Sequence, residues 1–223
     1  MYILIVNKVL NHSGGFYEYK IHKKKTDFLC NEKFLLLNSY LNDVIKNCPD
    51  EYFKSGPRSS ALKFQIPSIN LFQLKNHEIS ELAKYGLEIN KERFSENHPK
   101  VQNFMLENDN KTIAIEIPIW LNYNELSLYQ EIFNTKETLT GHIDLLRIEG
   151  NKIWIWDYKP NSIKERYATT QVYFYALMLS KRTNISLENF RCGYFDDKDT
   201  FLFNPENIQL TKTTQDLVQF IKN

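Results

Sequence analysis

The sequence predicts an α/β fold in which helices flank a central mixed β-sheet. The first observation is the order of elements in the C-terminal half, where strand-like alternation and helix-like spacing of apolar residues follow one another. The second is composition, because 42% of the 223 residues are apolar and 25% are charged, as in globular chains that bury a sizeable core. In this half we expect strands at 140–148 and 152–159, a helix at 163–181, and a strand hairpin at 190–195 and 200–203.

The N-terminal half is less regular. Residues 11–15 separate two strand-like segments and predict a hairpin turn. Pro99 follows His98 where a helical pattern begins, and proline is favoured at the start of a helix. We divide the chain into an N-terminal accessory segment, residues 1–76, and a core, residues 77–223. The elements expected here and at the C-terminus are strands at 1–10, 15–22 and 111–119, helices at 31–46, 77–91, 99–107 and 211–222, a loop-rich connection at 51–75, and a lid or insertion at 120–138.

Charge does not identify a partner for this chain. The net charge is +1, so a nucleic-acid site must come from a local arrangement of side chains. The densest basic segment, residues 20–25, has two interpretations. It is either a solvated strand end or a contact to a phosphate backbone.

The cysteines bear on cofactors and location. Cys30, Cys48 and Cys192 are far apart and form no C-x-x-C pair, which argues against a structural zinc site, an iron–sulfur cluster and a disulfide framework. A sparse cysteine content suits a reducing cytosol, so we expect a cytoplasmic protein. The first apolar run is too short for a signal peptide, and no stretch approaches ~20 apolar residues, so we expect no membrane partner.

Residues 141–159 carry the chemistry that the sequence suggests. If Gly150 and Asn151 form a two-residue turn, Asp144 falls directly opposite Asp157, with Cβ atoms roughly 5 Å apart. Lys159 is two residues further and shares the face of Asp157. Two close carboxylates repel, and burying them is costly unless cations are present. Lys159 would offset one charge and a divalent metal the other; the alternative is an exposed sheet edge with a solvated Asp–Lys pair.

Four further residues extend this pattern. Gln171 and Tyr175 are four apart in the next helix and share a face. Glu116 is an acid in an apolar strand, and His98 begins the helix before that strand. Each residue alone is ordinary, so the argument depends on the ordered set.

The set resembles the RecB-type branch of the PD-(D/E)XK nuclease superfamily, which includes the nuclease of CRISPR spacer acquisition. The resemblance spans roughly residues 98–203, and it implies a restriction-endonuclease-like core. The matching residues are, in chain order, His98, Glu116, the G-x-x-D strand from Gly141 to Asp144, the D-x-K strand from Asp157 to Lys159, and Q-x-x-x-Y from Gln171 to Tyr175.

The resemblance implies hydrolysis of DNA phosphodiester bonds that depends on Mg²⁺ or Mn²⁺, with exonuclease action on single strands or ends. Asp144, Asp157 and the main-chain carbonyl of Tyr158 would hold the metal. His98 would be an additional ligand, and His77 is the alternative because it also begins a helix. Members that hold an iron–sulfur cluster use four cysteines, and this chain has three, so we expect no cluster.

The resemblance also implies roles for the remaining residues. Lys159 would position or deprotonate the attacking water, and a pKa depressed by an apolar pocket and a metal would suit deprotonation. Gln171 and Tyr175 would hold the catalytic end and contact the nucleic-acid strand. Glu116 would be an acid in or next to the metal's coordination shell. The partner would be DNA, and since no P-loop motif occurs, a helicase or a defence or CRISPR protein on another chain is a candidate partner.

Two other functions remain open at this point. The chain could be a non-catalytic nucleic-acid-binding module of the same fold within a larger complex, because fold does not prove activity. It could also be a β-hairpin scaffold whose charges decorate the surface. Metal binding separates these alternatives from a nuclease.

Overall fold

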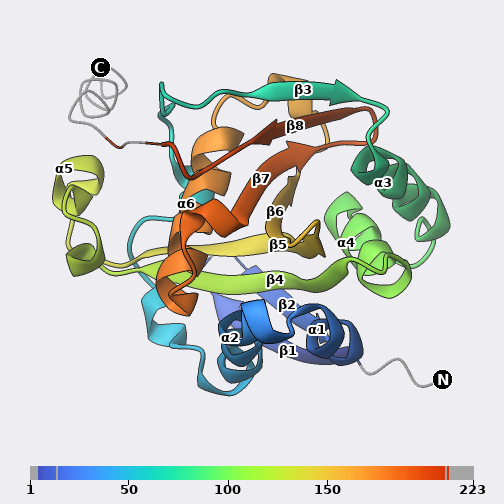
Figure 1. The fold of residues 1–223 in the computed structure, drawn as a ribbon, viewed down its shortest axis with the longest axis horizontal. Coiled ribbons are helices and arrows are strands. Elements are labelled where there is room, and N and C mark those ends of the chain that lie inside the picture. Colours follow the sequence, from blue (N-terminus) through green and yellow to red (C-terminus); the bar gives the residue numbers. More distant parts are fainter. Residues whose placement is uncertain (1–4, 14, 209, 211–223) are drawn as a thin grey trace.

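The computed structural model describes residues 5–13, 15–208 and 210. They form one sheet of eight strands in the order β1-β2-β4-β5-β6-β7-β8-β3 (Figure 1). β6 and β7 run parallel, and the other neighbouring strands run antiparallel, so the predicted mixed α/β sheet is confirmed. The strands are β1 (Ile5–His12), β2 (Gly15–His22), β3 (Phe72–Lys75), β4 (Thr112–Leu121), β5 (Leu139–Glu149), β6 (Lys152–Tyr158), β7 (Phe190–Phe195) and β8 (Asp199–Phe203).

Helices cover both faces of the sheet. The helices are α1 (Lys23–Leu29), α2 (Leu35–Asn47), α3 (Glu78–Ile89), α4 (Asn97–Asn108), α5 (Tyr129–Phe133) and α6 (Ala168–Thr183). α6 packs across β4 to β7 (Figure 1). α3 and α4 pack against each other and cover a separate core. The alternation along β6 separates the faces as predicted. Ile153 and Ile155 join the core under α6, whereas Trp156 and Tyr158 join the core under α3 and α4.

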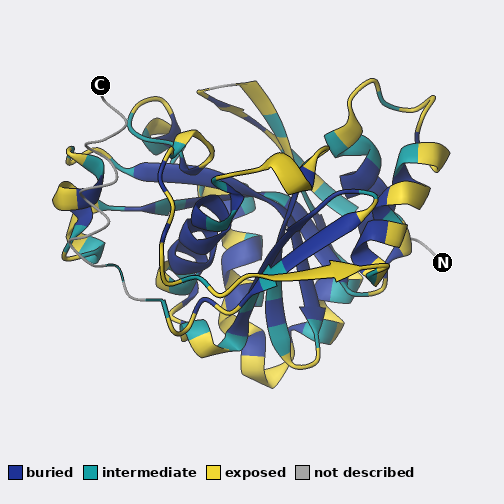
Figure 2. Ribbon diagram, turned by 90° about the horizontal axis from the view of Figure 1, so that it is seen from above, coloured by how far each residue is buried: buried dark blue, intermediate teal, exposed yellow. Residues whose placement is uncertain are grey.

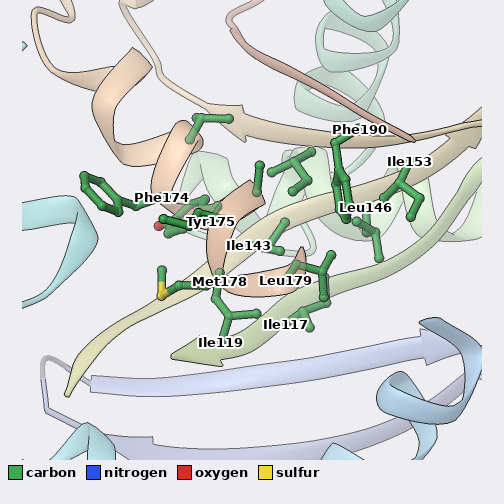
Figure 3. Close-up of a cluster of buried hydrophobic side chains, with 14 of the residues drawn as sticks. Ile117, Ile119, Ile143, Leu146, Ile153, Phe174, Tyr175, Met178, Leu179 and Phe190 are labelled. Carbon is green, nitrogen blue, oxygen red and sulfur yellow. The ribbon is translucent and has the colours of Figure 1, made fainter. Parts of the chain in front are cut away.

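The larger core lies between α6 and the central strands. Figure 3 shows Ile117, Ile143 and Ile153 from three neighbouring strands against Phe174 and Leu179 of α6. Buried residues dominate the central strands, while β3 at the edge is exposed along its whole length (Figure 2). No helix among the described residues is long and apolar enough to cross a lipid bilayer.

Several elements differ from the sequence prediction. The connection at 51–75 contains β3 in addition to short 3₁₀ turns. The segment 120–138 is not a lid, because Tyr129 and Ile132 of α5 are buried in the main core. The helix expected from 163 begins at Ala168, and the helix expected at 211–222 lies outside the described residues.

The later start of α6 has a local cause. The main-chain N–H and the hydroxyl of Ser162 both donate to Oδ2 of Asp196, at 2.9 Å and 2.8 Å. These bonds tie a short 3₁₀ turn to the loop after β7. The apolar periodicity that continues through this turn therefore does not represent helix.

The segment before residue 77 contributes to both edges of the same sheet. β1 and β2 pair with each other and β2 pairs with β4, while β3 pairs with β8 at the opposite edge. Tyr19, Leu37 and Leu41 from this segment lie in the main core. The predicted accessory segment therefore has no core separate from that of the later residues.

The basic segment 20–25 is used mainly within the fold. The ammonium of Lys20 donates to Oδ1 of Asn103 at 2.7 Å. The ammonium of Lys25 donates to the carbonyls of Leu106 and Asp109, at 2.5 Å and 2.6 Å. A cation at the C-terminal end of α4 is stabilised by the exposed carbonyls there. These contacts stabilise the junction of β2, α1 and α4 and leave Lys20 and Lys25 occupied.

A buried ion pair joins the end of α4 to β5. Arg147 is fully buried, and its Nε donates to Oδ2 of Asp109 at 2.9 Å. Thr112 and the main-chain N–H of Lys111 also donate to Asp109. Burial acts to raise the pKa of Asp109, but the Arg147 guanidinium and these hydrogen bonds outweigh it and lower that pKa.

We expect Asp109→Asn to lower the free energy of unfolding by about 3–5 kcal/mol, because it removes the closest counter-charge of a buried guanidinium. Urea unfolding measures this loss. The control is Glu107→Gln, which removes a surface ion pair with Arg93 at 2.8 Å and should cost less than about 1 kcal/mol. Equal losses of unfolding free energy in the two variants would contradict a stabilising role for the buried pair of Asp109 and Arg147.

The same pair predicts a loss of stability on the acid side. Since the pKa of Asp109 is lower in the folded chain, its contribution is present above the unfolded value, about 4, and disappears as pH falls through the folded value. The stability gap between wild type and Asp109→Asn should therefore narrow below about pH 4. Urea unfolding measures this difference in stability. A difference that stays constant as pH falls below about 4 would rule out the contribution of the Asp109 carboxylate.

Candidate active site

The hairpin of β5 and β6 has the geometry that the sequence predicts. Gly150 and Asn151 form its turn with φ of 55° and 58°, as two-residue hairpin turns require. The predicted register is confirmed as far as the pair of Leu145 and Trp156. The hairpin lies in the middle of the sheet, with β4 on one side and β7 on the other.

Asp144 and Asp157 come next in this register, where the ladder ends. Oδ2 of Asp144 accepts a hydrogen bond of 2.9 Å from the main-chain N–H of Tyr158, so a carboxylate replaces a ladder carbonyl. The exposed fraction is 8% for Asp144 and 1% for Asp157. The interpretation of this hairpin as an exposed edge with solvated charges is therefore wrong.

Asp157 is held by two side chains. The ammonium of Lys159 lies 2.7 Å from its Oδ2, and Nε2 of Gln171 donates to its Oδ1 at 3.0 Å. Lys159 is fixed in turn, because its main-chain N–H donates to the carbonyl of Phe195 in β7 at 2.8 Å. Burial raises the pKa of Asp157, and the nearby Asp144 carboxylate adds to the shift, although Lys159 opposes it.

Two neighbouring carboxylates stabilise the charged form of Lys159. Burial acts to lower the pKa of Lys159, but the carboxylates of Asp157 and Asp144 outweigh burial and raise that pKa. The two acids therefore stabilise the ammonium, and the depressed pKa expected beside a bound metal stays a prediction.

Glu116 lies at an irregular point of β4. The ladder with β5 pairs the residues on either side of Glu116 and Asp144, which places these acids opposite each other. The φ of Glu116 is 52°, in the left-handed region that costs a non-glycine residue of order 1–3 kcal/mol. Burial raises the pKa of Glu116, and the Asp144 carboxylate raises it further. Strain and charge are thus concentrated at one residue, as is common at functional sites.

The structure distinguishes His98 from His77, the two histidines that the sequence offered as the additional metal ligand. His98 lies in the first turn of α4 with its Nε2 3.6 Å from Oδ2 of Asp144. His77 is the N-cap of α3, and its ring lies 5.7 Å from the ring of Trp156. His98 is therefore the histidine that reaches the acids.

Sequence reasoning missed Gln102. Its Nε2 donates to Oε1 of Glu116 at 2.6 Å, and the residue is buried. Gln102 follows His98 by four positions, so both lie on one face of α4. That spacing was visible in the sequence, but a glutamine in a helix carries no signal without the position of Glu116.

Gly141 is required by close packing. A Cβ at this position would lie 2.6 Å from Cε1 of Tyr175 and 2.9 Å from Oγ of Ser59. The hydroxyl of Tyr175 accepts a hydrogen bond of 2.7 Å from Nε2 of Gln171, the same amide that binds Asp157. Tyr175 is only 3% exposed. Its burial does not fit the expected contact with a nucleic-acid strand. Tyr175 positions Gln171 instead.

A cleft of 510 Å³ opens beside the acids. Its lining includes Glu116, His98 and Gln102 together with the aromatic residues Phe16 and Phe94. The ring of Phe16 is 78% exposed. Glu116, His98 and Gln102 therefore line a solvent-accessible space that aromatic residues also line.

The separation of two strands accounts for this cleft. The ladder between β2 and β4 extends through the pair of Lys20 and Ile115, and Glu116 follows directly. The left-handed backbone of Glu116 therefore lies directly after the last pair of this ladder. Pro118, which lacks an N–H, lies beyond the opening and still pairs in register with β5.

The donor set fits a hard divalent cation. Glu116, Asp144 and Asp157 bring three carboxyl groups together beside the single ammonium of Lys159, and burial, with the Asp144 carboxylate, raises the pKa values of Glu116 and Asp157. Among the described residues, Oδ2 of Asp157 has no hydrogen-bond partner of good geometry, although Lys159 lies close to it. Carboxylate oxygens are the ligands that Mg²⁺ and Mn²⁺ prefer.

Comparison with known protein families identifies the chain's superfamily. The family model of the PD-(D/E)XK nuclease superfamily matches residues 58–221. No curated protein matches the chain. Among solved structures, the chain is similar to one described as "Crystal structure of SSO0001", with 12% identity, 85% of each chain covered and a TM-score of 0.38. Members of the matched superfamily are generally metal-dependent nucleases, typically with Mg²⁺ or Mn²⁺. The family match covers most of the chain and includes every residue of the site from His98 to Tyr175, and the protein therefore belongs to the PD-(D/E)XK nuclease superfamily.

Proposed function

We propose that this protein is a deoxyribonuclease that depends on Mg²⁺ or Mn²⁺ and acts as an exonuclease on single strands or ends. The observation that carries the proposal is the convergence of Asp144, Asp157 and Lys159, all buried or nearly so, where two central strands stop pairing. Burying charges in a fold costs free energy, and apolar residues would give a more stable structure. The buried acids therefore support catalysis rather than scaffolding.

The proposed metal ligands are Asp144, Asp157 and the main-chain carbonyl of Tyr158, with His98 as an additional ligand. A bound divalent cation would polarise the scissile phosphate and lower the pKa of a coordinated water. Lys159 has three donor hydrogens, and its contact with Asp157 leaves others for the attacking water and the phosphate. Its positive charge also balances the phosphate.

The surrounding residues keep these groups in place. Gln171 holds Oδ1 of Asp157 and is itself held by Tyr175. Gln102 donates to the carboxylate of Glu116, and both residues line the cleft. We assign Glu116 to the cation or to water bound to it.

The cleft supports a preference for unpaired bases. Phe16 and Phe94 line it within the same space as Glu116, and exposed aromatic rings stack on bases of any sequence. The bases of an intact duplex are already stacked, so a single strand or a frayed end would gain more from these rings. The choice of DNA over RNA and the assignment to the RecB-type branch both rest on the family resemblance alone.

The second candidate is a non-catalytic nucleic-acid-binding module in a larger complex, with a helicase or a defence or CRISPR protein as partner. The same cleft would serve it. The presence of Asp144, Asp157 and Lys159 together counts against it, because a module that only binds does not need them.

The first test is cleavage of end-labelled single- and double-stranded DNA and of RNA, with Mn²⁺, Mg²⁺ or a chelator. We expect cutting of single-stranded DNA with either cation and none with the chelator. Asp157→Ala and Lys159→Ala should each reduce the rate by about 100-fold or more. The exposed Lys84→Ala serves as the control and should cut like wild type.

Binding without cutting under every condition would favour the non-catalytic module. Cleavage of closed circular duplex as fast as linear single strands would exclude the exonuclease assignment.

Phe16→Ala tests the aromatic wall. In chelator, where strands stay intact, it should weaken binding of single-stranded DNA by about 5-fold or more, since stacking contributes about 1–3 kcal/mol per base. Fluorescence anisotropy measures the affinity. Phe28→Ala is the matched control, because Phe28 is 75% exposed on α1 and does not line the cleft. Equal affinities of the two variants for single-stranded DNA would show that the cleft is not part of the surface that binds it.

A further inference from the structure

A second cluster of ligating side chains lies near the turn end of the first hairpin. His12 ends β1, Cys48 follows α2, and Asp50 begins the next 3₁₀ turn. Within the part of the chain that the structure describes, this is the group of His, Cys, Asp or Glu residues whose ligand atoms all lie within 4.8 Å of one another. Nε2 of His12 lies 3.1 Å from Oδ1 of Asp50 and 4.0 Å from Sγ of Cys48.

These distances, 3.1 Å and 4.0 Å, lie on either side of those in a tetrahedral transition-metal site, so shifts of a few tenths of an ångström would bring the ligand atoms to that geometry. Bonds of about 2.0–2.3 Å to nitrogen, oxygen and sulfur place tetrahedral ligand atoms roughly 3.3–3.7 Å from one another. One imidazole, one thiol and one carboxylate form a borderline-soft set that suits Zn²⁺ or Co²⁺ rather than Mg²⁺. Asp50 has a side chain that is 48% exposed, so an ion can arrive from solvent.

A second histidine fixes the orientation of the first. Nδ1 of His12 lies 2.8 Å from Nε2 of His142, and both rings are buried. His12 stacks on Phe53 at 3.9 Å, and His142 stacks on Tyr17 at 3.7 Å. If Nδ1–H of His12 donates to His142, the lone pair of Nε2 points to the cluster. Metal-binding histidines are commonly oriented through their other ring nitrogen in this way.

We propose that His12, Cys48 and Asp50 bind one Zn²⁺-class ion, with a water molecule as the fourth ligand and His142 as the residue that positions His12. Binding breaks the S–H bond of Cys48 and forms a sulfur–metal bond, and the proton leaves to solvent. Burial raises the pKa of the Cys48 thiol to about 12, so the metal must displace that proton. The ion would tie β1 to the segment after α2 and, through His142, to β5 two residues before Asp144.

Cobalt reports this site without interference from the proposed nuclease site, which contains no thiol. The full chain is titrated with Co²⁺ in the presence of excess Mg²⁺. We expect one equivalent with a thiolate-to-cobalt charge-transfer band in the near ultraviolet and d–d bands typical of tetrahedral coordination. Cys48→Ala should abolish the charge-transfer band, whereas Cys30→Ala, which removes a different buried thiol, should retain it.

A variant at an exposed position excludes misfolding as the cause. Asp50→Asn should weaken Co²⁺ and Zn²⁺ binding by about 10-fold or more, and Glu51→Gln, its exposed neighbour, should not. Zn²⁺ should raise the thermal midpoint of wild type and of Glu51→Gln but not that of Cys48→Ala. His142→Phe, which removes the acceptor of His12, should weaken binding by about 10- to 100-fold.

The absence of a thiolate band in wild type, or its persistence in Cys48→Ala, would overturn the site. Unchanged affinity in His142→Phe would overturn the positioning role. Because no readout uses cleavage, these outcomes are independent of the nuclease proposal.

Discussion

Mutual repulsion among three carboxylates is the constraint on which the rest of this structure depends. Glu116, Asp144 and Asp157 meet where the central strands stop pairing, and burial raises the pKa of two of them. Such a concentration of charge persists only if the surrounding structure holds it. Lys159, which follows β6, provides an opposite charge, and Gln102 of α4 provides an amide donor, so the acids are held from more than one element.

Strand β5 supports this arrangement along its length. Gly141 allows Tyr175 to approach, and Tyr175 holds the amide that binds Asp157. Asp144 ends the ladder with β6, and Arg147 anchors the end of α4 through a buried ion pair. α4 carries His98 and Gln102, which reach the acids. The ion pair of Arg147 with Asp109, at the end of α4, therefore helps to position these two residues.

The segment before residue 77 takes part in the site as well as in the sheet. Phe16 lines the cleft beside the acids. Ser59 donates to the carbonyl of Thr140 and packs against Gly141. His12 contacts His142 in the strand that carries Asp144. The N-terminal hairpin thus forms part of the lining of the cleft beside Glu116.

The sequence by itself determined the mixed α/β class, the register of the hairpin and the approach of Asp144, Asp157 and Lys159. It could do so because alternation along a strand and a two-residue turn decide which side chains share a face. Gln171 and Tyr175 followed from helical spacing in the same way.

Only the tertiary structure decided which histidine reaches the acids, that Gln102 binds Glu116, that Lys159 has a raised pKa, and that Tyr175 is buried. These facts depend on how α4 and α6 pack on the sheet, and on charges brought together from distant segments. Local patterns contain no information on such contacts, because burial and long-range electrostatics arise from the assembled fold.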